Sequence, residues 1–245
     1  NYTASSEALV AAVDKAEIKT IYTSRLFIKK LKTRGIDLQE VFDKVKVYEL
    51  EEFRDKISTF KKLAIFSLCK LLPANLLYRL YGQQVDISSP AAILFSSGSE
   101  GTPKGVVLSH KNLMGNVKQV SDVLDIQAED VMMGSLPQFH AFGLTVSGLM
   151  PMIEGIPVVF HPDPTDVLNI GKAITKNKIT VLCGTSTFLR LYARNRKVLP
   201  LMLDSLRLVI AGAERLNIDV RTAFEKKFNR PIYEGYGTTE TTPVA

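Results

Sequence analysis

The stretch AAILFSSGSEGTPKGVVLSH, residues 91–110, decides the fold. An apolar run from Ala91 to Ser96 predicts a strand, a loop dense in serine, threonine and glycine follows, and a β-prone run then leads into a helix expected over His110 to Leu124. Glycines let a backbone turn sharply with its N–H groups pointing inward, hydroxyls donate to phosphate oxygens, and Lys104 neutralises negative charge. The stretch therefore predicts a phosphate-binding loop between a strand and a helix.

Two common nucleotide-binding loops do not match this stretch. Pro103 precedes Lys104 where the GxxxxGK[ST] loop requires glycine, and the GxGxxG spacing is absent. An ordinary glycine- and serine-rich turn remains an alternative. The concentration of hydroxyls, glycines and a lysine between Ser96 and Lys104 favours phosphate binding.

The rest of the chain alternates helices with short apolar strands. Apolar residues recur at helical spacing from Ser5 to Glu17, a strand is expected from Thr20 to Thr23, and a second helix leads to a strand from Val45 to Leu50. Further strands are expected near Val131 to Ser135, Pro157 to Phe160, Thr180 to Cys183, Leu206 to Ile210 and Pro231 to Glu234. This alternation predicts an α/β fold with layers of parallel β-sheet flanked by helices.

One segment breaks the alternation. Residues Phe60 to Tyr81 read FKKLAIFSLCKLLPANLLYRLY, which predicts two short helices joined at Pro73. Basic side chains beside leucine and phenylalanine suit a membrane surface, with the lysine stems lying along it. A helical hairpin that packs on a sheet, or on sequence outside this chain, is the favoured interpretation.

Composition excludes several classes of function. The chain has 245 residues, with 31 basic and 25 acidic side chains dispersed along it, and no basic cluster interleaved with aromatic residues, so we expect no nucleic-acid partner. Its two cysteines, Cys69 and Cys183, have no zinc-site spacing. No signal pattern or bilayer-spanning apolar run occurs, which predicts a soluble chain in a reducing compartment.

Three motifs occur in a characteristic order: SSGSEGTPKG at 96–105, LPQFHAFGLT at 136–145 and IYEGYGTTET at 232–241, the last preceded by AGAERL at 211–216. Together they resemble the signatures of the acyl-adenylate-forming, or AMP-binding, superfamily. The resemblance implies part of the large N-terminal domain of an acetyl-CoA synthetase-like fold. Members join a carboxylate to the α-phosphate of ATP, release pyrophosphate and pass the acyl group to a thiol.

The resemblance also implies roles for individual residues, with ATP and Mg²⁺ as cofactors. Thr239 is expected to bond the α-phosphate, and Glu240 to hold Mg²⁺ through an oxygen ligand suited to a hard cation. Tyr236 is expected to stack on adenine. The phosphate-binding residues are Ser96, Ser97, Gly98, Ser99, Gly101, Thr102 and Lys104, and the residues that shape the adenine slot are Gly212, Ala213, Glu214 and Gly235. Glu234 and Gly237 complete the cofactor-binding set.

His140, in the middle motif, is implied to lie near the acyl carboxylate and completes the catalytic set with Thr239 and Glu240. A purely structural histidine is an equally open interpretation. Phe139, Phe142 and Gly143 line an acyl tunnel or simply pack.

A second pair of residues suggests a different chemistry. His161 and Asp166 have the HxxxxD spacing of glycerolipid acyltransferases. Pro162 and Pro164 interrupt that motif and no other acyltransferase residues accompany it, so we expect no catalysis there.

The closest resemblance is to the acyl-[acyl-carrier-protein] synthetase part of bacterial bifunctional enzymes that also carry a 2-acylglycerophosphoethanolamine acyltransferase. IYTSRLFI, RLVIAGAERL, PIYEGYGTTETTPVA and Glu100 carry it. It implies a fatty acid, acyl carrier protein or CoA, and a lysophospholipid as partners, at the cytoplasmic face of the bacterial inner membrane. A long-chain fatty acyl-CoA synthetase and a non-catalytic binding module are the alternatives.

The same resemblance implies that residues 1–245 form a truncated AMP-binding domain. An acyltransferase domain is expected upstream, and a small C-terminal lid subdomain with its catalytic lysine is expected downstream. We therefore expect the isolated chain to bind ATP weakly or not at all and to turn over negligibly.

Overall fold

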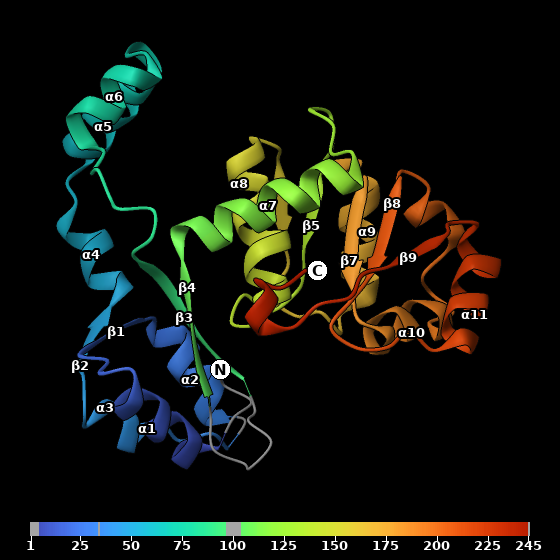
Figure 1. The fold of residues 1–245 in the computed structure, drawn as a ribbon, viewed down its shortest axis with the longest axis horizontal. Helices are drawn as coiled ribbons and strands as arrows, with labels where there is room; N and C mark the ends of the chain where they lie inside the picture. The colour runs from blue at the N-terminus through green and yellow to red at the C-terminus, as the bar shows by residue number, and fades with distance from the viewer. Residues whose placement is uncertain (1–4, 34, 97–103, 245) are drawn as a thin grey trace. The chain divides into compact units, whose positions relative to one another are not determined.

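The computed structural model describes residues 5–33, 35–96 and 104–244 (Figure 1). The chain forms two compact units. The first consists of Asn1–Ser89 with Phe95–Gly105, and the second of Pro90–Leu94 with Val106–Ala245.

The first unit contains a small parallel sheet. Strands β1 (Thr20–Thr23) and β2 (Lys46–Glu49) pair in parallel, with Thr20 opposite Lys46. Its helices are α1 (Ser6–Lys15), α2 (Arg25–Thr33), α3 (Gln39–Phe42), α4 (Leu50–Lys56), α5 (Thr59–Leu71) and α6 (Ala74–Tyr81). One residue from each of α1, α2 and α3 is buried, namely Val13, Leu31 and Val41. The helix–strand alternation predicted for this region is confirmed.

Helices α5 and α6 confirm the two helices predicted on either side of Pro73. No residue of either helix is buried, and Phe60 and Leu71 are each 80% exposed. Among the described residues this hairpin therefore does not pack on a sheet, and its packing on sequence outside this chain stays a prediction. Within the described residues, no helix has both the length and the apolar character needed to cross a bilayer.

The second unit is built on a parallel sheet of five strands in the order β6-β5-β7-β8-β9. Its strands are β5 (Met132–Gly134), β6 (Val158–Phe160), β7 (Val181–Gly184), β8 (Leu208–Ala211) and β9 (Ile232–Glu234). Its helices are α7 (His110–Leu124), π-helix η1 (Gly143–Leu149), α8 (Met150–Glu154), α9 (Val167–Asn177), α10 (Ser186–Arg194), 3-10 helix η2 (Pro200–Leu203), α11 (Ile218–Phe228) and 3-10 helix η3 (Thr239–Thr241). The α/β fold with a parallel sheet is confirmed, and each predicted strand lies within about two residues of its expected bounds.

Helices cover both faces of this sheet because successive strand residues point to opposite sides. On β7, Leu182 packs with α9, α10 and α11, whereas Val181 and Cys183 pack with α7, η1 and α8. Strand β8 alternates in the same way. Both faces of the strands are thus apolar, as parallel strands buried on two sides require.

Strands β3 (Pro90–Ser96) and β4 (Lys104–Ser109) form a separate two-stranded sheet. Leu94 and Leu108 are buried with Leu113 of α7 and Ala141. Ser109 caps α7 in a capping box with Asn112, which explains why the helix begins at His110.

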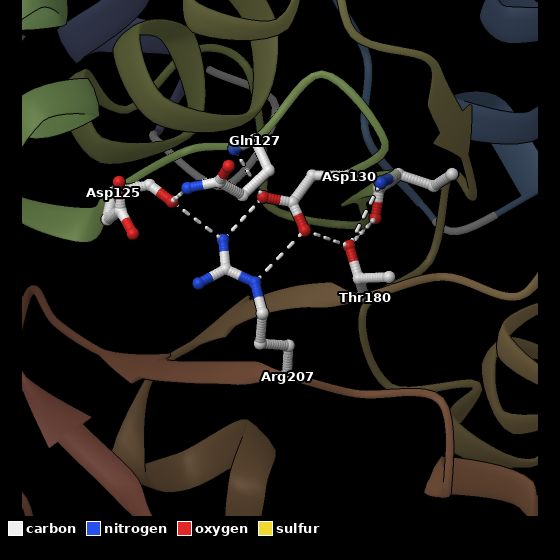
Figure 2. Close-up of polar contacts among 6 residues, drawn as sticks. Asp125, Gln127, Asp130, Thr180 and Arg207 are labelled. Carbon is white, nitrogen blue, oxygen red and sulfur yellow. Dashed lines mark hydrogen bonds and ion pairs between the residues drawn. The ribbon is translucent and has the colours of Figure 1, made fainter.

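A buried ion pair joins three strands of the larger sheet at their amino ends (Figure 2). Asp130 is 2% exposed and lies just before β5, whereas Thr180 lies before β7 and Arg207 before β8. The Asp130 carboxylate accepts a hydrogen bond from Arg207 Nε at 3.2 Å and one from Thr180 Oγ1 at 2.6 Å. Arg207 Nη2 also donates to the Asp125 carbonyl at 3.0 Å. Burial alone raises the pKa of Asp130, but the hydrogen bonds from Arg207, Thr180 and Gln127 outweigh burial and lower it.

We predict that Asp130→Asn lowers the free energy of unfolding by about 2–3 kcal/mol, because it leaves the Arg207 guanidinium without its counter-ion. Arg207 is partly exposed, so the loss stays below that of a fully buried pair. Chemical denaturation measures the change. The control is Asp122→Asn, which breaks a surface pair with Lys118 and is expected to cost about 0.5 kcal/mol or less.

The difference in unfolding free energy between wild type and Asp130→Asn depends on pH because the pKa of Asp130 is lowered in the folded state. A carboxyl whose pKa is lower in the folded than in the unfolded state stabilises the fold above its unfolded pKa of about 4, and this stabilisation is lost as the pH falls through the folded value. The stability gap between wild type and Asp130→Asn should be constant near neutral pH and shrink below about pH 4. A gap that widens in acid contradicts this account.

Candidate functional site

The sequence-predicted residues of the second unit lie along one edge of its sheet. Strands β5, β7, β8 and β9 are parallel, so the loops after their last residues meet at the carboxyl edge. In the sheet, β5 and β7 are neighbours, but the chain continues from β5 to β6 at one side of this pair and from β7 to β8 at the other. The carboxyl ends of β5 and β7 therefore form a topological switch point. Open α/β sheets bind ligands at such a point.

His140 stands in the loop that follows β5. Its ring lies 4.5 Å from that of Phe139 between centroids, and it remains exposed at the surface. Partial desolvation of the ring lowers the pKa of His140, which favours the neutral imidazole at neutral pH. The structure therefore leaves His140 accessible at the switch point, as a ligand-contacting histidine requires.

A π-helix begins at Gly143, three residues after His140, which the sequence analysis did not predict. A Cβ on Gly143 would lie 2.1 Å from the Pro137 carbonyl oxygen, so only glycine allows this helix to start so close to the loop. Thr145 is fully buried, and its Oγ1 has no hydrogen-bond partner among the described residues. π-helical segments occur frequently beside functional sites.

The loop after β8 carries Gly212, Ala213 and Glu214. Gly212 is buried, its N–H donates to the Gly184 carbonyl at 3.1 Å, and a Cβ there would meet the Phe142 ring at 3.0 Å. Ala213 has a φ of 67°, in the left-handed region. The Glu214 carboxylate accepts from the Thr187 N–H at 2.5 Å, in the first turn of α10. This loop is held by contacts to its neighbours on both sides.

The loop after β9 carries the remaining predicted residues of this unit. Tyr236 is 74% exposed, and Glu240 is exposed in η3. Thr239 is half-buried. The backbone of Gly237 passes so close to the Pro243 carbonyl oxygen that a Cβ would lie 1.6 Å from it. The loop thus presents an aromatic ring and a carboxylate on a tightly packed backbone.

Asn116 is a residue that the sequence analysis missed. It is buried on α7, its Nδ2 donates to the Val244 carbonyl at 2.6 Å, and its Oδ1 accepts from the Val244 N–H at 3.4 Å. The sequence contained a sign of its importance, because Asn116 is a polar residue on the apolar face of α7 that Leu113, Val117 and Val120 define. A polar residue at that position requires a partner, and here the partner is the end of the Tyr236 loop.

The predicted phosphate-binding loop is only partly described. Ser97, Gly98, Ser99, Gly101 and Thr102 lie outside the described residues. Ser96 ends β3 and Lys104 begins β4, where Lys104 is exposed. Their assignment to phosphate stays a prediction.

The HxxxxD pair has a structural role. His161 Nδ1 accepts from the Asp163 N–H at 3.3 Å, and Asp166 caps α9 by accepting from the Asn169 N–H at 3.3 Å and its Nδ2 at 2.8 Å. The His161 Nε2 to Asp166 Oδ2 distance is 3.6 Å. Both side chains therefore shape the start of α9.

The described residues fit a nucleotide with Mg²⁺. Tyr236 offers an exposed ring for a base, and Glu240 offers an exposed surface carboxylate. Within the described ranges no group of three or more His, Cys, Asp or Glu side chains gathers in one place. Mg²⁺ usually takes one or two protein carboxylates together with phosphate oxygens and water, so a single glutamate is sufficient on the protein side.

Comparison with known proteins identifies the family. The family described as AMP-binding enzyme matches residues 1–245, so the chain belongs to the AMP-binding enzyme family. It is similar to the long-chain-fatty-acid–CoA ligase of Bacillus subtilis, at 29% identity over 158 residues, which covers 63% of this chain and 28% of the relative. It is also similar to 4-coumarate–CoA ligase 3 of Arabidopsis thaliana, at 28% identity over 241 residues, which covers 91% of this chain and 41% of the relative.

Solved structures support the same fold. A malonyl-CoA ligase in a ternary product complex with methylmalonyl-CoA and AMP aligns with a TM-score of 0.75 at 18% identity, over 100% of this chain and 46% of that one. ATP-bound MatB from Rhodopseudomonas palustris aligns with a TM-score of 0.70 at 22% identity, over 98% and 44%. The chain spans less than half the length of these relatives and has the fold of the corresponding part of acetyl-CoA synthetase-like ligases.

We predict that Gly237→Ala destabilises the second unit by about 1–3 kcal/mol, because the new methyl group displaces backbone in the Tyr236 loop. Hydrogen exchange at residues 235–244 and chemical denaturation measure it. Gly115→Ala is the matched control. In the described part of the chain, no atom beyond the neighbouring backbone of α7 lies within 4 Å of a Cβ on this exposed glycine, and alanine there should stabilise the helix by up to about 1 kcal/mol. Equal effects of the two substitutions contradict the packing described for Gly237.

Proposed function

We propose that the chain forms the nucleotide-binding part of an ATP-dependent ligase that activates a fatty acid as an acyl adenylate. The supporting observation is that the loops carrying His140, Gly212 and Tyr236 follow strands of one parallel sheet at its carboxyl edge. Membership of the AMP-binding family supports the nucleotide. The similarity to long-chain-fatty-acid–CoA ligases of Bacillus subtilis and Yersinia pestis supports the fatty acid.

The proposed roles follow from what each side chain offers. Tyr236 presents an exposed ring on which adenine stacks, Thr239 donates its hydroxyl to the α-phosphate, and Glu240 holds Mg²⁺. A neutral His140 at the switch point lies beside the incoming carboxylate without adding charge. When bound, ATP supplies the adenylyl group that makes the carboxyl carbon reactive. The chain's own contribution is to position the two reactants and to surround the phosphates with donors.

Acyl carrier protein is the proposed thiol acceptor, on the resemblance to bacterial acyl-[acyl-carrier-protein] synthetases that serve lysophospholipid reacylation. CoA is the alternative, which the names of the fatty-acid ligase relatives favour. Comparing the rates of acyl transfer to CoA and to holo acyl carrier protein in the full-length protein separates them.

An aromatic acid is a second candidate substrate. The similarity to 4-coumarate–CoA ligases, which reaches 34% identity over 160 residues for the Oryza sativa enzyme, favours it. Pyrophosphate exchange with fatty acids of increasing length and with 4-coumarate distinguishes the two. Exchange with 4-coumarate alone overturns the proposal of a fatty acid.

Peripheral membrane association is proposed as well. The exposed apolar residues of α5 and α6 lie beside Lys61, Lys62, Lys70 and Arg79, a combination that suits the cytoplasmic face of an anionic membrane. Sedimentation with anionic and with neutral vesicles tests it, and equal sedimentation with both argues against it.

We predict that Thr239→Ala and Glu240→Ala each lower carboxylate-dependent ATP–pyrophosphate exchange in the full-length protein by about 30-fold or more, which corresponds to the loss of about 2 kcal/mol. Thr222→Ala removes an exposed hydroxyl of α11 that donates to the Ile218 carbonyl, and it should leave exchange unchanged. Exchange that persists in both variants at the wild-type rate refutes the assignment.

A further inference from the structure

The loop of residues 212–217 forms hydrogen bonds with α10 and with β9. It starts after β8, where the Gly212 N–H donates to β7, and it ends at Asn217, which caps α11 by accepting from the Asp219 N–H at 2.8 Å. Between these points runs the segment that the sequence motif AGAERL places beside a nucleotide. Two carboxylates of this region, Glu214 and Glu234, already accept hydrogen bonds from backbone N–H groups of the protein.

Glu214 attaches the loop to α10. Its Oε1 accepts from the Thr187 N–H at 2.5 Å, in the first turn of α10, where the exposed N–H groups and the helix dipole favour a negative charge. The Asn217 N–H donates to the hydroxyl of Ser186, also in that turn, at 3.1 Å, and Ser186 is buried. The loop therefore meets α10 at both ends of its central segment.

Glu234 attaches the same loop to β9. Its Oε1 accepts from the Leu216 N–H at 2.9 Å, and its Oε2 lies 3.5 Å from Arg221 Nη2 of α11. Both oxygens of Glu234 are therefore directed at protein groups. The carboxylate joins the loop after β8 to the last residue of β9, beside Tyr236.

The contacts stabilise a backbone that would otherwise be unfavourable. Ala213 has a φ of 67°, and alanine rarely adopts the left-handed region. Gly212 has no room to move toward Phe142, because a Cβ at this glycine would already lie 3.0 Å from the Phe142 ring. A conformation of this kind persists only where its surroundings hold it, and here the surroundings are Thr187, Ser186 and Glu234.

We propose that Glu214 and Glu234 are positioning residues that hold the 212–217 loop in the shape that receives the nucleotide, and that neither carboxylate contacts the nucleotide. The proposal rests on the proposed function, because it takes the bound molecule to be the nucleotide. It revises the role implied by resemblance, in which both glutamates belong to the cofactor-binding set. Partial desolvation opposes ionisation of the exposed Glu214, but hydrogen bonds from Thr187 and Thr185 and the charge of Arg190 lower its pKa, so the carboxylate is ionised at neutral pH.

The test compares alanine and glutamine at both positions. Glutamine keeps a carbonyl oxygen that accepts from the Thr187 or Leu216 N–H, whereas alanine removes the contact. We expect Glu214→Ala and Glu234→Ala to raise the Kd for AMP about tenfold or more, and the glutamine variants to stay within about threefold of wild type. Asp204→Ala is the control, since it removes the same charge from an exposed carboxylate paired with Arg230.

Titration calorimetry with AMP and hydrogen exchange at the Thr187 and Leu216 amides, both on the full-length protein, give the two readouts. Lost amide protection and lost affinity in the alanine variants, both restored by glutamine, support the proposal. Equal losses of affinity in glutamine and alanine variants with unchanged amide protection mean that the carboxylates contact the nucleotide, which overturns it.

If the full-length wild type binds no AMP, the proposed function fails and hydrogen exchange alone decides the positioning role. Loop amides that lose protection in the alanine variants and keep it in the glutamine variants then support the role. Unchanged protection in all four variants overturns it.

Discussion

The buried pair of Asp130 and Arg207 sets the constraint on which the second unit depends. It binds the residues just before β5, β7 and β8 to one another, with Thr180 as the third partner. A strand that slipped by one residue would turn its apolar side chains to the opposite face and move its end by about 3.3 Å. Because each of these strands is buried on both faces, a single register satisfies both the polar network and the apolar packing.

The two edges of the sheet have different tasks. At the amino edge, charged and hydroxyl groups satisfy one another in the network of Asp130. At the carboxyl edge, polar side chains bond to backbone: Glu214 to Thr187, Glu234 to Leu216, and Asn116 to Val244. Such bonds fix the course of each loop while Tyr236 and Glu240 remain exposed. The side chains that fix the loops are thus different from the exposed side chains that can contact a ligand, and the two sets are adjacent.

The sequence alone predicted the strands and helices well because their signal is local. Apolar periodicity placed α7 at His110–Leu124 and β1 at Thr20–Thr23, as observed. The π-helix was missed because apolar periodicity does not reveal the close approach of Gly143 to the Pro137 carbonyl. Motif resemblance singled out His140, Gly212 and Tyr236, and the structure places the loops that carry them at one edge of the sheet. The hydrogen-bond partners of Glu214 and Glu234 come from α10 and from the loop after β8, and no sequence spacing reveals them. The sequence did not decide what covers α5 and α6, because hydrophobicity does not say which surface packs on a helix.

The contact between Asn116 and Val244 spans 128 positions of the chain, which bears on the order in which the molecule is assembled. During synthesis α7 emerges long before Val244, and until then the buried amide of Asn116 has no backbone partner to replace water. An unpaired buried amide costs about 1–3 kcal/mol, so this face of α7 is fully satisfied only after Val244 has been synthesised. Contacts of such long range slow folding. A segment translated well after α7 therefore completes the packing of this helix.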